Sequence, residues 1–203
     1  MTMIEVVVTG SLYTNSYIIS NNDNECVLVD PGLSYEKAAN LIKEKYKVKA
    51  ILITHGHVDH IDGIKYFDVP VYIHEADEAF LYDSSLSLYI MMGMRTPFKK
   101  GSLNVNTVKD GDVISLIGYD FKVMHTPGHT RGSVCYSYKN KVLSGDTLFN
   151  NSCGRTDFPT GSGVDMSKSL KRIIDEYPSN YDVYPGHDSK TTIKKEQNNP
   201  YIR

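Results

Sequence analysis

Apolar residues recur along the first fifty positions in short runs separated by polar turns. We predict strands at Ile4–Thr9, Ser16–Ser20 and Cys26–Val29, because these runs are rich in branched residues and end at turn-forming residues. From Ser34 to about Tyr46 the apolar residues instead follow the helical period. A helix is predicted there, with Ser34 as its N-cap.

The middle of the chain alternates between strands and helical segments. The apolar run Ala50–Ile53 predicts a buried strand, and a short helix and a further strand are expected over Ile61–Phe67 and Val69–Ile73. Apolar residues at helical spacing predict a longer helix over Glu75–Met94. Core packing is the favoured interpretation of Met91 on that helix, and a pliable pocket wall is the alternative.

The second half of the chain repeats this arrangement of strands followed by a helix. A helix is predicted near Met166–Tyr177, after a long loop over Asn150–Val164. Strands are predicted at Asn104–Val108, Val113–Leu116, Tyr119–His125, Ser133–Tyr138, Lys141–Leu143 and Asp182–Tyr184. The pattern predicts an α/β fold with two sheets face to face and helices outside. Because no linker interrupts residues 1–203, we expect one domain.

Composition narrows the class of protein. The chain has 203 residues, 40% of them hydrophobic and 23% charged, which is typical of a globular protein. A net charge of −2 gives no electrostatic reason to expect nucleic acid. No apolar run approaches the roughly 18 residues that would span a membrane. The three cysteines are far apart and predict reduced thiols, so a cytoplasmic location without a membrane is expected.

The stretch Thr54-His55-Gly56-His57-Val58-Asp59-His60 carries the strongest chemical signal. It places three imidazoles and one carboxylate directly after the predicted strand Ala50–Ile53. Ligands in α/β folds bind at the carboxyl ends of strands, and zinc and its first-row neighbours prefer these side chains. A solvated loop is the alternative interpretation, and we favour a metal centre.

Further candidate ligands stand beside turns later in the chain. His129 and His187 each follow Pro-Gly, and Asp146 ends a predicted hairpin. A catalytic zinc takes about three protein ligands, so the full set suits two ions that share a carboxylate. The seven candidates are His55, His57, Asp59, His60, His129, Asp146 and His187.

These motifs resemble those of the metallo-β-lactamase superfamily of hydrolases. The resemblance rests on T-H-G-H-V-D-H, T-P-G-H-T, S-G-D-T-L-F and P-G-H, between Thr54 and His187. Within the superfamily, T-N-S-Y-I-I, G-D-T-L-F and G-R-T-D-F are similar to the compact glyoxalase II-like proteins of the hydroxyacylglutathione hydrolase type. The motifs do not resemble those of a true β-lactamase, because the second site carries Asp59 and His60 and no cysteine belongs to the ligand set.

The resemblance implies an αββα four-layer sandwich with two divalent metal ions at one edge. The ions are expected to be zinc, with iron or manganese as alternatives. The implied ligands are His55, His57 and His129 for the first ion, Asp59, His60 and His187 for the second, and Asp146 as the bridge between them.

The implied reaction is hydrolysis of a thioester such as a hydroxyacylglutathione. In a two-metal site a bridging water is acidified toward a pKa of about 7, and the resulting hydroxide attacks the carbonyl carbon. Asp59 and Asp146 are the predicted catalytic carboxylates, and Asp59 would also accept a proton. A thiolate, with a pKa of about 8.5, leaves with little acid assistance. Two divalent ions outweigh the two carboxylates and the hydroxide, so an anionic small-molecule substrate is predicted.

Several residues allow two interpretations. Arg155 would bind a substrate carboxylate or, slightly favoured, pair with Asp157. Asp30 would accept a hydrogen bond from a ligand imidazole or shape its own turn. His74 and His125 are interpreted as structural.

Other functions remain open at this stage. One alternative is a persulfide dioxygenase, which shares the fold and resembles this chain over Cys153–Phe158. Its single iron would need two His and one carboxylate as ligands. His55, His129 and Asp146 would supply them. A lactone or ester is an alternative substrate, because the sequence after His187 shows no counterpart of the helical region that binds glutathione in longer glyoxalase II enzymes. A non-catalytic metal-binding protein is the third alternative.

Overall fold

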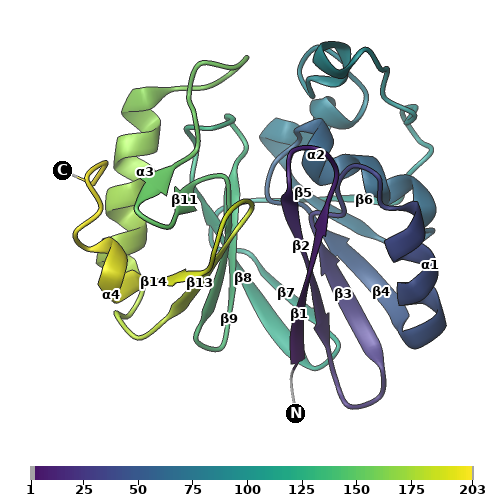
Figure 1. Ribbon diagram of the computed structural model, residues 1–203, viewed down its shortest axis with the longest axis horizontal. Helices are drawn as coiled ribbons and strands as arrows, with labels where there is room; N and C mark the ends of the chain where they lie inside the picture. Colours follow the sequence, from purple (N-terminus) through teal and green to yellow (C-terminus); the bar gives the residue numbers. More distant parts are fainter. Residues whose placement is uncertain (1–2, 203) are drawn as a thin grey trace.

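The structure, a computed structural model, describes residues 3–202 as two β-sheets packed face to face (Figure 1). The first sheet contains, in order across the sheet, β1 (Met3–Thr9), β2 (Thr14–Ser20), β3 (Glu25–Val29), β4 (Lys47–Leu52), β5 (Val71–His74) and β6 (Val105–Val108). The second contains β14 (Thr191–Thr192), β13 (Asp182–Pro185), β10 (Lys141–Gly145), β9 (Val134–Tyr138), β8 (Tyr119–His125) and β7 (Val113–Leu116). A small ribbon pairs β11 (Leu148–Phe149) with β12 (Ser152–Cys153).

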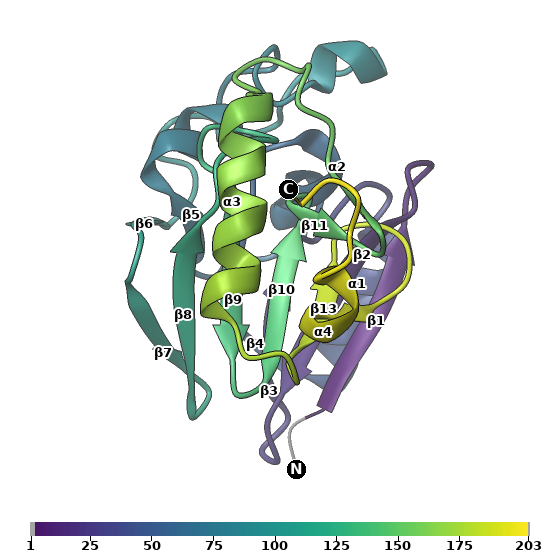
Figure 2. The same cartoon turned by 90° about the vertical axis from the view of Figure 1, so that its left-hand side faces the viewer.

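Helices cover the outer face of each sheet. The α-helices are α1 (Glu36–Lys45), α2 (Val58–Ile61), α3 (Gly163–Glu176) and α4 (Ile193–Glu196). The 3₁₀ helices are η1 (Asp62–Tyr66), η2 (Glu75–Leu81) and η3 (Tyr89–Met92). Helix α1 lies outside the first sheet, and α3 lies across the outer face of β8, β9 and β10 (Figures 1 and 2). No helix in the described part of the chain is long and apolar enough to cross a membrane.

Three apolar layers hold these elements together. Between the sheets, Tyr17 and Val29 share one buried cluster with Phe121 and Tyr136. A second cluster joins the apolar face of α1 to the first sheet, and a third joins α3 to the second sheet. Helix, sheet, sheet and helix therefore form four layers, and the predicted αββα sandwich is confirmed.

The carboxyl ends of strands from both sheets meet at one edge of the sandwich. Strand β4 runs parallel to β3 and β5, and β10 runs parallel to β13. The amide of Val134 donates to the carbonyl of Thr54 at 2.8 Å, and that of Asn15 donates to Gly186 at 2.7 Å. These bonds connect the sheets where β4 and β13 end, which is where ligands bind in α/β folds.

The predicted long helix over Glu75–Met94 is wrong. The segment forms the short 3₁₀ helices η2 and η3 with turns between them. The Asp83 carboxylate accepts hydrogen bonds from the amides of Ser85 and Leu86, and Leu88 adopts a φ of +65°. Side-chain bonds of this kind compete with the helical ladder, so the apolar period alone overestimates the helix.

The predicted N-cap at Ser34 is also wrong. Ser34 has a φ of +57°, and α1 begins at Glu36 after Tyr35. The hydroxyls of Tyr35 and Ser16 lie 2.7 Å apart in the buried core, so a tertiary contact holds the residue that precedes the helix.

Candidate metal centre

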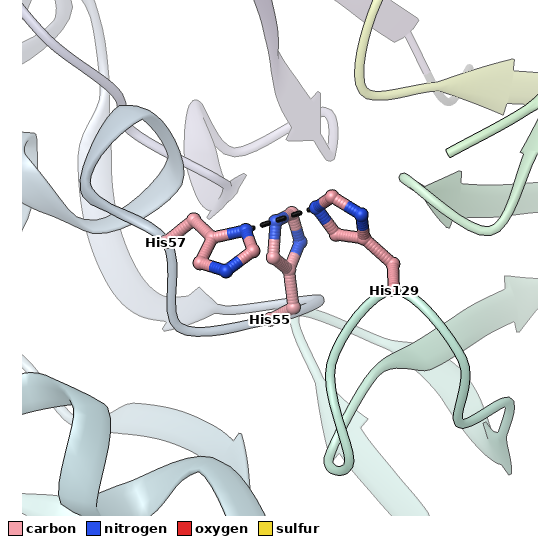
Figure 3. A group of neighbouring side chains, drawn as sticks. All are labelled: His55, His57 and His129. Carbon is pink, nitrogen blue, oxygen red and sulfur yellow. Dashed lines mark hydrogen bonds between the residues drawn. The ribbon is translucent and has the colours of Figure 1, made fainter. Parts of the chain in front are cut away.

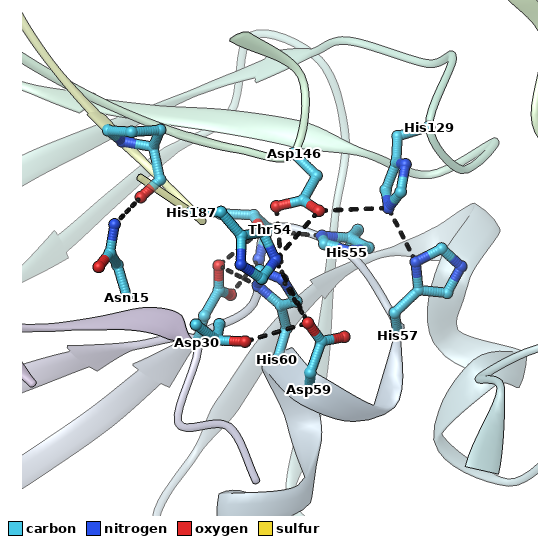
Figure 4. A network of polar contacts seen from close by, with 12 residues as sticks. Asn15, Asp30, Thr54, His55, His57, Asp59, His60, His129, Asp146 and His187 are labelled. Atoms are coloured by element: carbon cyan, nitrogen blue, oxygen red, sulfur yellow. Dashed lines mark hydrogen bonds and ion pairs between the residues drawn. The ribbon is translucent and has the colours of Figure 1, made fainter. Parts of the chain in front are cut away.

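All seven candidate ligands converge at the edge where the strands end (Figure 4). Four of them lie in the loop after β4 and in α2, and the others follow β8, β10 and β13. They form three overlapping groups, each with ligand atoms within 4.8 Å of one another: His55, His57 and His129; His55, His60 and Asp146; Asp59, His60 and His187.

The first group consists of three buried imidazoles (Figure 3). Nδ1 of His57 lies 2.9 Å from Nε2 of His129. In a tetrahedral site with metal–nitrogen bonds of about 2.0–2.1 Å, two ligand nitrogens lie about 3.3 Å apart. The His57–His129 separation is shorter than this, and the ligand atoms of all three imidazoles lie within 4.8 Å of one another, which brings them together as candidate ligands of one ion.

Carboxylates lie among the ligands of the other half of the site, the group of Asp59, His60 and His187. Oδ2 of Asp59 lies 3.3 Å from Nε2 of His187 and 3.5 Å from Nε2 of His60. Asp146 reaches both groups, with Oδ2 at 3.5 Å from Nε2 of His129 and 3.4 Å from Nε2 of His187. Asp146 therefore has the position that a shared carboxylate requires.

The opposite ring nitrogens are held by the protein, which orients the imidazoles. Nδ1 of His60 lies 3.0 Å from Oδ2 of Asp30. Nδ1 of His129 and Nδ1 of His187 lie 2.7 Å and 3.1 Å from the carbonyls of Arg155 and Leu12. Such contacts fix the tautomer and leave each Nε2 free to bind a metal.

Asp30 bonds to a candidate ligand. Besides His60, its carboxylate accepts hydrogen bonds from the amide and the hydroxyl of Thr54 at 2.8 and 2.6 Å. Of the two interpretations of Asp30, the contact with an imidazole is therefore the one that the structure contains.

Unpartnered buried atoms test whether these residues fit metal ions. Within residues 3–202, the buried side-chain atoms without a hydrogen-bond partner include Nε2 of His55, His57 and His60 and Oδ1 of Asp146. Buried polar atoms are almost always satisfied, because leaving one unpaired costs about 1–3 kcal/mol. Three of these atoms belong to one group of candidate ligands, His55, His60 and Asp146, so a cation there would satisfy them together.

Protonation differs between the two halves of the site. Burial lowers the pKa of His57 to about 3 and that of His55 well below its usual value. Burial also opposes charge on His60, but the carboxylates around it, Asp59 first, raise its pKa to about 9. Burial is likewise outweighed at His187, whose pKa rises to about 11 through its bonds to Asp146 and Asp59.

Asp77 is a buried residue beside the site that the sequence analysis missed. Its Oδ2 accepts from the amide of Gly56 at 3.0 Å and from the hydroxyl of Thr130 at 2.6 Å, and its Oδ1 accepts from the amide of Gly132 at 2.8 Å. The carboxylate therefore connects the loop of His55 and His57 to the loop of His129. Its one sequence signal was an acidic residue inside an apolar helical pattern.

A pocket of about 510 Å³ opens beside the carboxylates. Met91 lines this pocket and is 67% exposed, so the favoured core interpretation of Met91 is wrong. Its contact with a substrate stays a prediction. Apart from the metal-ligand candidates, the lining consists mainly of apolar side chains: Leu12, Val58, Leu88, Met91, Met92, Phe149 and Phe158.

Arg155 also lines the pocket and pairs with Asp157. Its Nε and Nη2 donate to the two carboxylate oxygens, each at 2.6 Å, and its guanidinium lies 4.0 Å from the centroid of the Phe158 ring. The favoured interpretation of Arg155 is thus confirmed. His74 and His125 stack at a centroid distance of 4.0 Å, away from the seven candidate ligands.

Comparisons with known proteins give the family. Residues 9–187 match the metallo-beta-lactamase superfamily, and the chain belongs to it. The probable metallo-hydrolase YqgX of Bacillus subtilis is 33% identical over 95% of this chain and 94% of its own. The hydroxyacylglutathione hydrolase GloC of Haemophilus influenzae is 27% identical over 98% of this chain and 97% of its own.

Solved structures agree with the fold. The crystal structure of BLEG-1 B3 metallo-beta-lactamase is similar with a TM-score of 0.88 at 33% identity, covering 98% of this chain and 99% of that one. The crystal structure of TTHA1623 in a di-iron-bound form has a TM-score of 0.83 at 33% identity, covering 98% of this chain and 100% of that one.

Proposed function

We propose that the protein is a dinuclear-metal hydrolase that cleaves thioesters. The observation that carries the proposal is the position of Asp146, whose Oδ2 lies within 3.5 Å of His129 and His187 from the two halves of the site. A bound pair of divalent ions would supply Lewis acidity and lower the pKa of a water toward neutrality.

The protein's own residues would orient the ions and the substrate. His55, His57 and His129 would hold one ion, and Asp59, His60 and His187 would hold the other, with Asp146 between them. Asp59 accepts a hydrogen bond from the hydroxyl of Thr14 at 3.0 Å, which fixes its carboxylate at the pocket wall. There it is placed to take a proton from an attacking water. A thiolate can leave without a protein acid, since thiols ionise at a pKa of about 8.5.

The relatives support hydrolysis more strongly than they support a particular substrate. YqgX is named a probable metallo-hydrolase, and GloC is named a hydroxyacylglutathione hydrolase at a lower identity. The di-iron form of TTHA1623 makes iron as reasonable a metal as zinc. We therefore propose thioester hydrolysis without fixing the metal.

The direct test is a rate measurement on protein loaded separately with zinc, iron and manganese. S-lactoylglutathione and a neutral thioester of N-acetylcysteamine are offered as substrates, and free thiol is measured. Hydrolysis of either supports the proposal. Oxygen uptake on glutathione persulfide by iron-loaded protein, with no thioester cleaved, would replace it by the dioxygenase reaction.

A further inference from the structure

The pocket beside the metal centre has few charged side chains in its wall other than the candidate ligands. Its polar lining consists chiefly of the ligand candidates themselves, and the rest is apolar. Among the described residues that line it, Arg155 is the one lysine or arginine, and both oxygens of Asp157 already bind its guanidinium. Because this pair has no net charge, the pocket wall holds no unpaired Lys or Arg for a substrate carboxylate.

The apolar lining comes from segments that are far apart in sequence. Leu12 lies between β1 and β2, Met91 and Met92 lie in η3, and Phe149 and Phe158 lie on either side of β12. Leu12 and Met91 remain 46% and 67% exposed. Large apolar side chains exposed together around one cavity mark a binding surface, and methionine adapts to chains of different shape.

This apolar surface is continuous with the reacting end of the pocket. The same cavity is lined by Asp59, Asp146 and His187 on one side and by Met91 and Leu12 elsewhere. A carbonyl placed at the metal centre would therefore have its attached chain against apolar side chains. The volume of about 510 Å³ lies within the range of pockets that enclose small-molecule ligands.

We propose that the substrate is a thioester that carries an extended apolar chain next to the scissile bond, and that Met91 contributes to its selection. The proposal rests on the thioesterase function proposed above and names the substrate class for that site. The tripeptide part of a glutathione conjugate carries two carboxylates and gains little from this wall. An apolar chain gains from each methylene that leaves water.

The test uses two series of N-acetylcysteamine-type thioesters on the metal-loaded full-length protein. In one series the acyl chain lengthens from two to eight carbons, and in the other the thiol part lengthens while the acyl group stays acetyl. We expect kcat/KM to rise by about two- to fourfold per methylene in at least one series. The series that rises identifies which side of the thioester the pocket holds.

Two Met→Gln substitutions distinguish an effect at the pocket wall from an effect of the substitution itself on the protein. Met91→Gln should reduce the rise per methylene to less than about twofold. Met94→Gln is the matched control, because Met94 is on the same segment and 38% exposed but does not line this pocket. It should keep the wild-type slope. A Met91→Gln protein with the wild-type slope would refute the role of Met91.

A binding measurement distinguishes failure of this inference from failure of the thioesterase function. Uncleavable thioether analogues of the same two series are titrated into the metal-loaded full-length protein by calorimetry. Affinity that rises with chain length supports the apolar pocket, whatever the rates are. If no thioester is hydrolysed while affinity rises in this way, the proposed function is refuted and the inference about the pocket is not. Rates and affinities that stay flat in both series, or the highest kcat/KM on S-lactoylglutathione, would overturn the inference.

Discussion

Asp77 accepts a 2.6 Å hydrogen bond from the hydroxyl of Thr130, the residue that follows His129. The same carboxylate oxygen accepts from the amide of Gly56, which lies between His55 and His57. One buried side chain therefore sets the distance between the two loops that supply the first group of imidazoles. None of its hydrogen bonds goes to an imidazole, so Asp77 would affect metal binding by positioning the two loops.

Replacing Asp77 tests this connection. Asp77→Asn keeps the shape of the side chain but replaces one carboxylate oxygen by an NH₂ group, which cannot accept a hydrogen bond. The side chain therefore loses the bond from the amide of either Gly56 or Gly132. We expect metal affinity to fall about tenfold while the far-ultraviolet circular dichroism stays unchanged. Glu78→Gln, on the same 3₁₀ helix, is the control and should bind metal as the wild type does. Equal affinities in the two variants would show that the loops are positioned by other contacts.

The two carboxylates of the site should differ in how many ions they hold. Asp146→Ala is expected to lose both ions, because Asp146 approaches both groups. Asp59→Ala should retain an ion in the group of His55, His57 and His129, which Asp59 does not join. In either variant hydrolysis should fall by at least about 100-fold, because the two-metal arrangement is lost. Metal analysis of the purified variants measures the difference, and full occupancy in Asp146→Ala would exclude a shared carboxylate.

Removing the metal should destabilise the fold. An ion that binds the folded state and is present at 100 times its Kd stabilises it by about 2.7 kcal/mol. For a chain of this length each kcal/mol shifts Tm by about 2–4 °C, so chelation should lower Tm by about 5–11 °C per ion. Scanning calorimetry with and without a chelator gives the shift, and an unchanged Tm would contradict metal binding at these clusters.

The ion pair between Arg172 of α3 and Asp110, which lies between β6 and β7, predicts how stability depends on pH. Asp110 is exposed, and the effect of burial, which raises the pKa of its carboxyl, is outweighed by its hydrogen bonds, that from Arg172 first, which lower it. A lowered carboxyl pKa stabilises the fold above the unfolded value of about 3.9, and this contribution is lost as pH falls through the folded value. Asp110→Asn should therefore cost about 0.5–1 kcal/mol at pH 7 and progressively less as pH falls below about 4.

The control for this prediction is Asp175→Asn, which removes an exposed pair with Lys171 on the same helix. It should change the free energy of unfolding by less than about 0.5 kcal/mol at either pH. Urea unfolding at pH 7 and pH 3.5 measures both variants. A cost for Asp110→Asn that is the same at the two pH values would show that the pair contributes no charge-dependent stability.

The sandwich and the convergence of the ligands were predictable from the sequence, because both depend on local signals. The strand that ends at Leu52 leads directly into His55 and His57, and Asp146 follows another strand end. Once strands from two sheets end at one edge, the side chains beyond them must meet. The clustering of the candidate ligands can therefore be predicted without knowledge of most long-range contacts.

The parts that could not be predicted depend on contacts across long sequence separations. Asp77 bonds to Gly56, Thr130 and Gly132 across 21, 53 and 55 positions. The segment around Met91 has the apolar period of a buried helix, but local turns expose it at the pocket. An apolar pattern shows that a side chain will pack against something, and it does not distinguish a core from the wall of a pocket.

The measurement that tests the dinuclear centre most directly is the metal content of protein purified without added metal. The site predicts close to two ions per chain, whether zinc, iron or manganese. His55, His57 and His129 form one group and Asp59, His60 and His187 another, and Asp146 lies within 3.5 Å of a histidine in each. A single ion per chain that stays single when metal is added in excess would contradict the two-metal account.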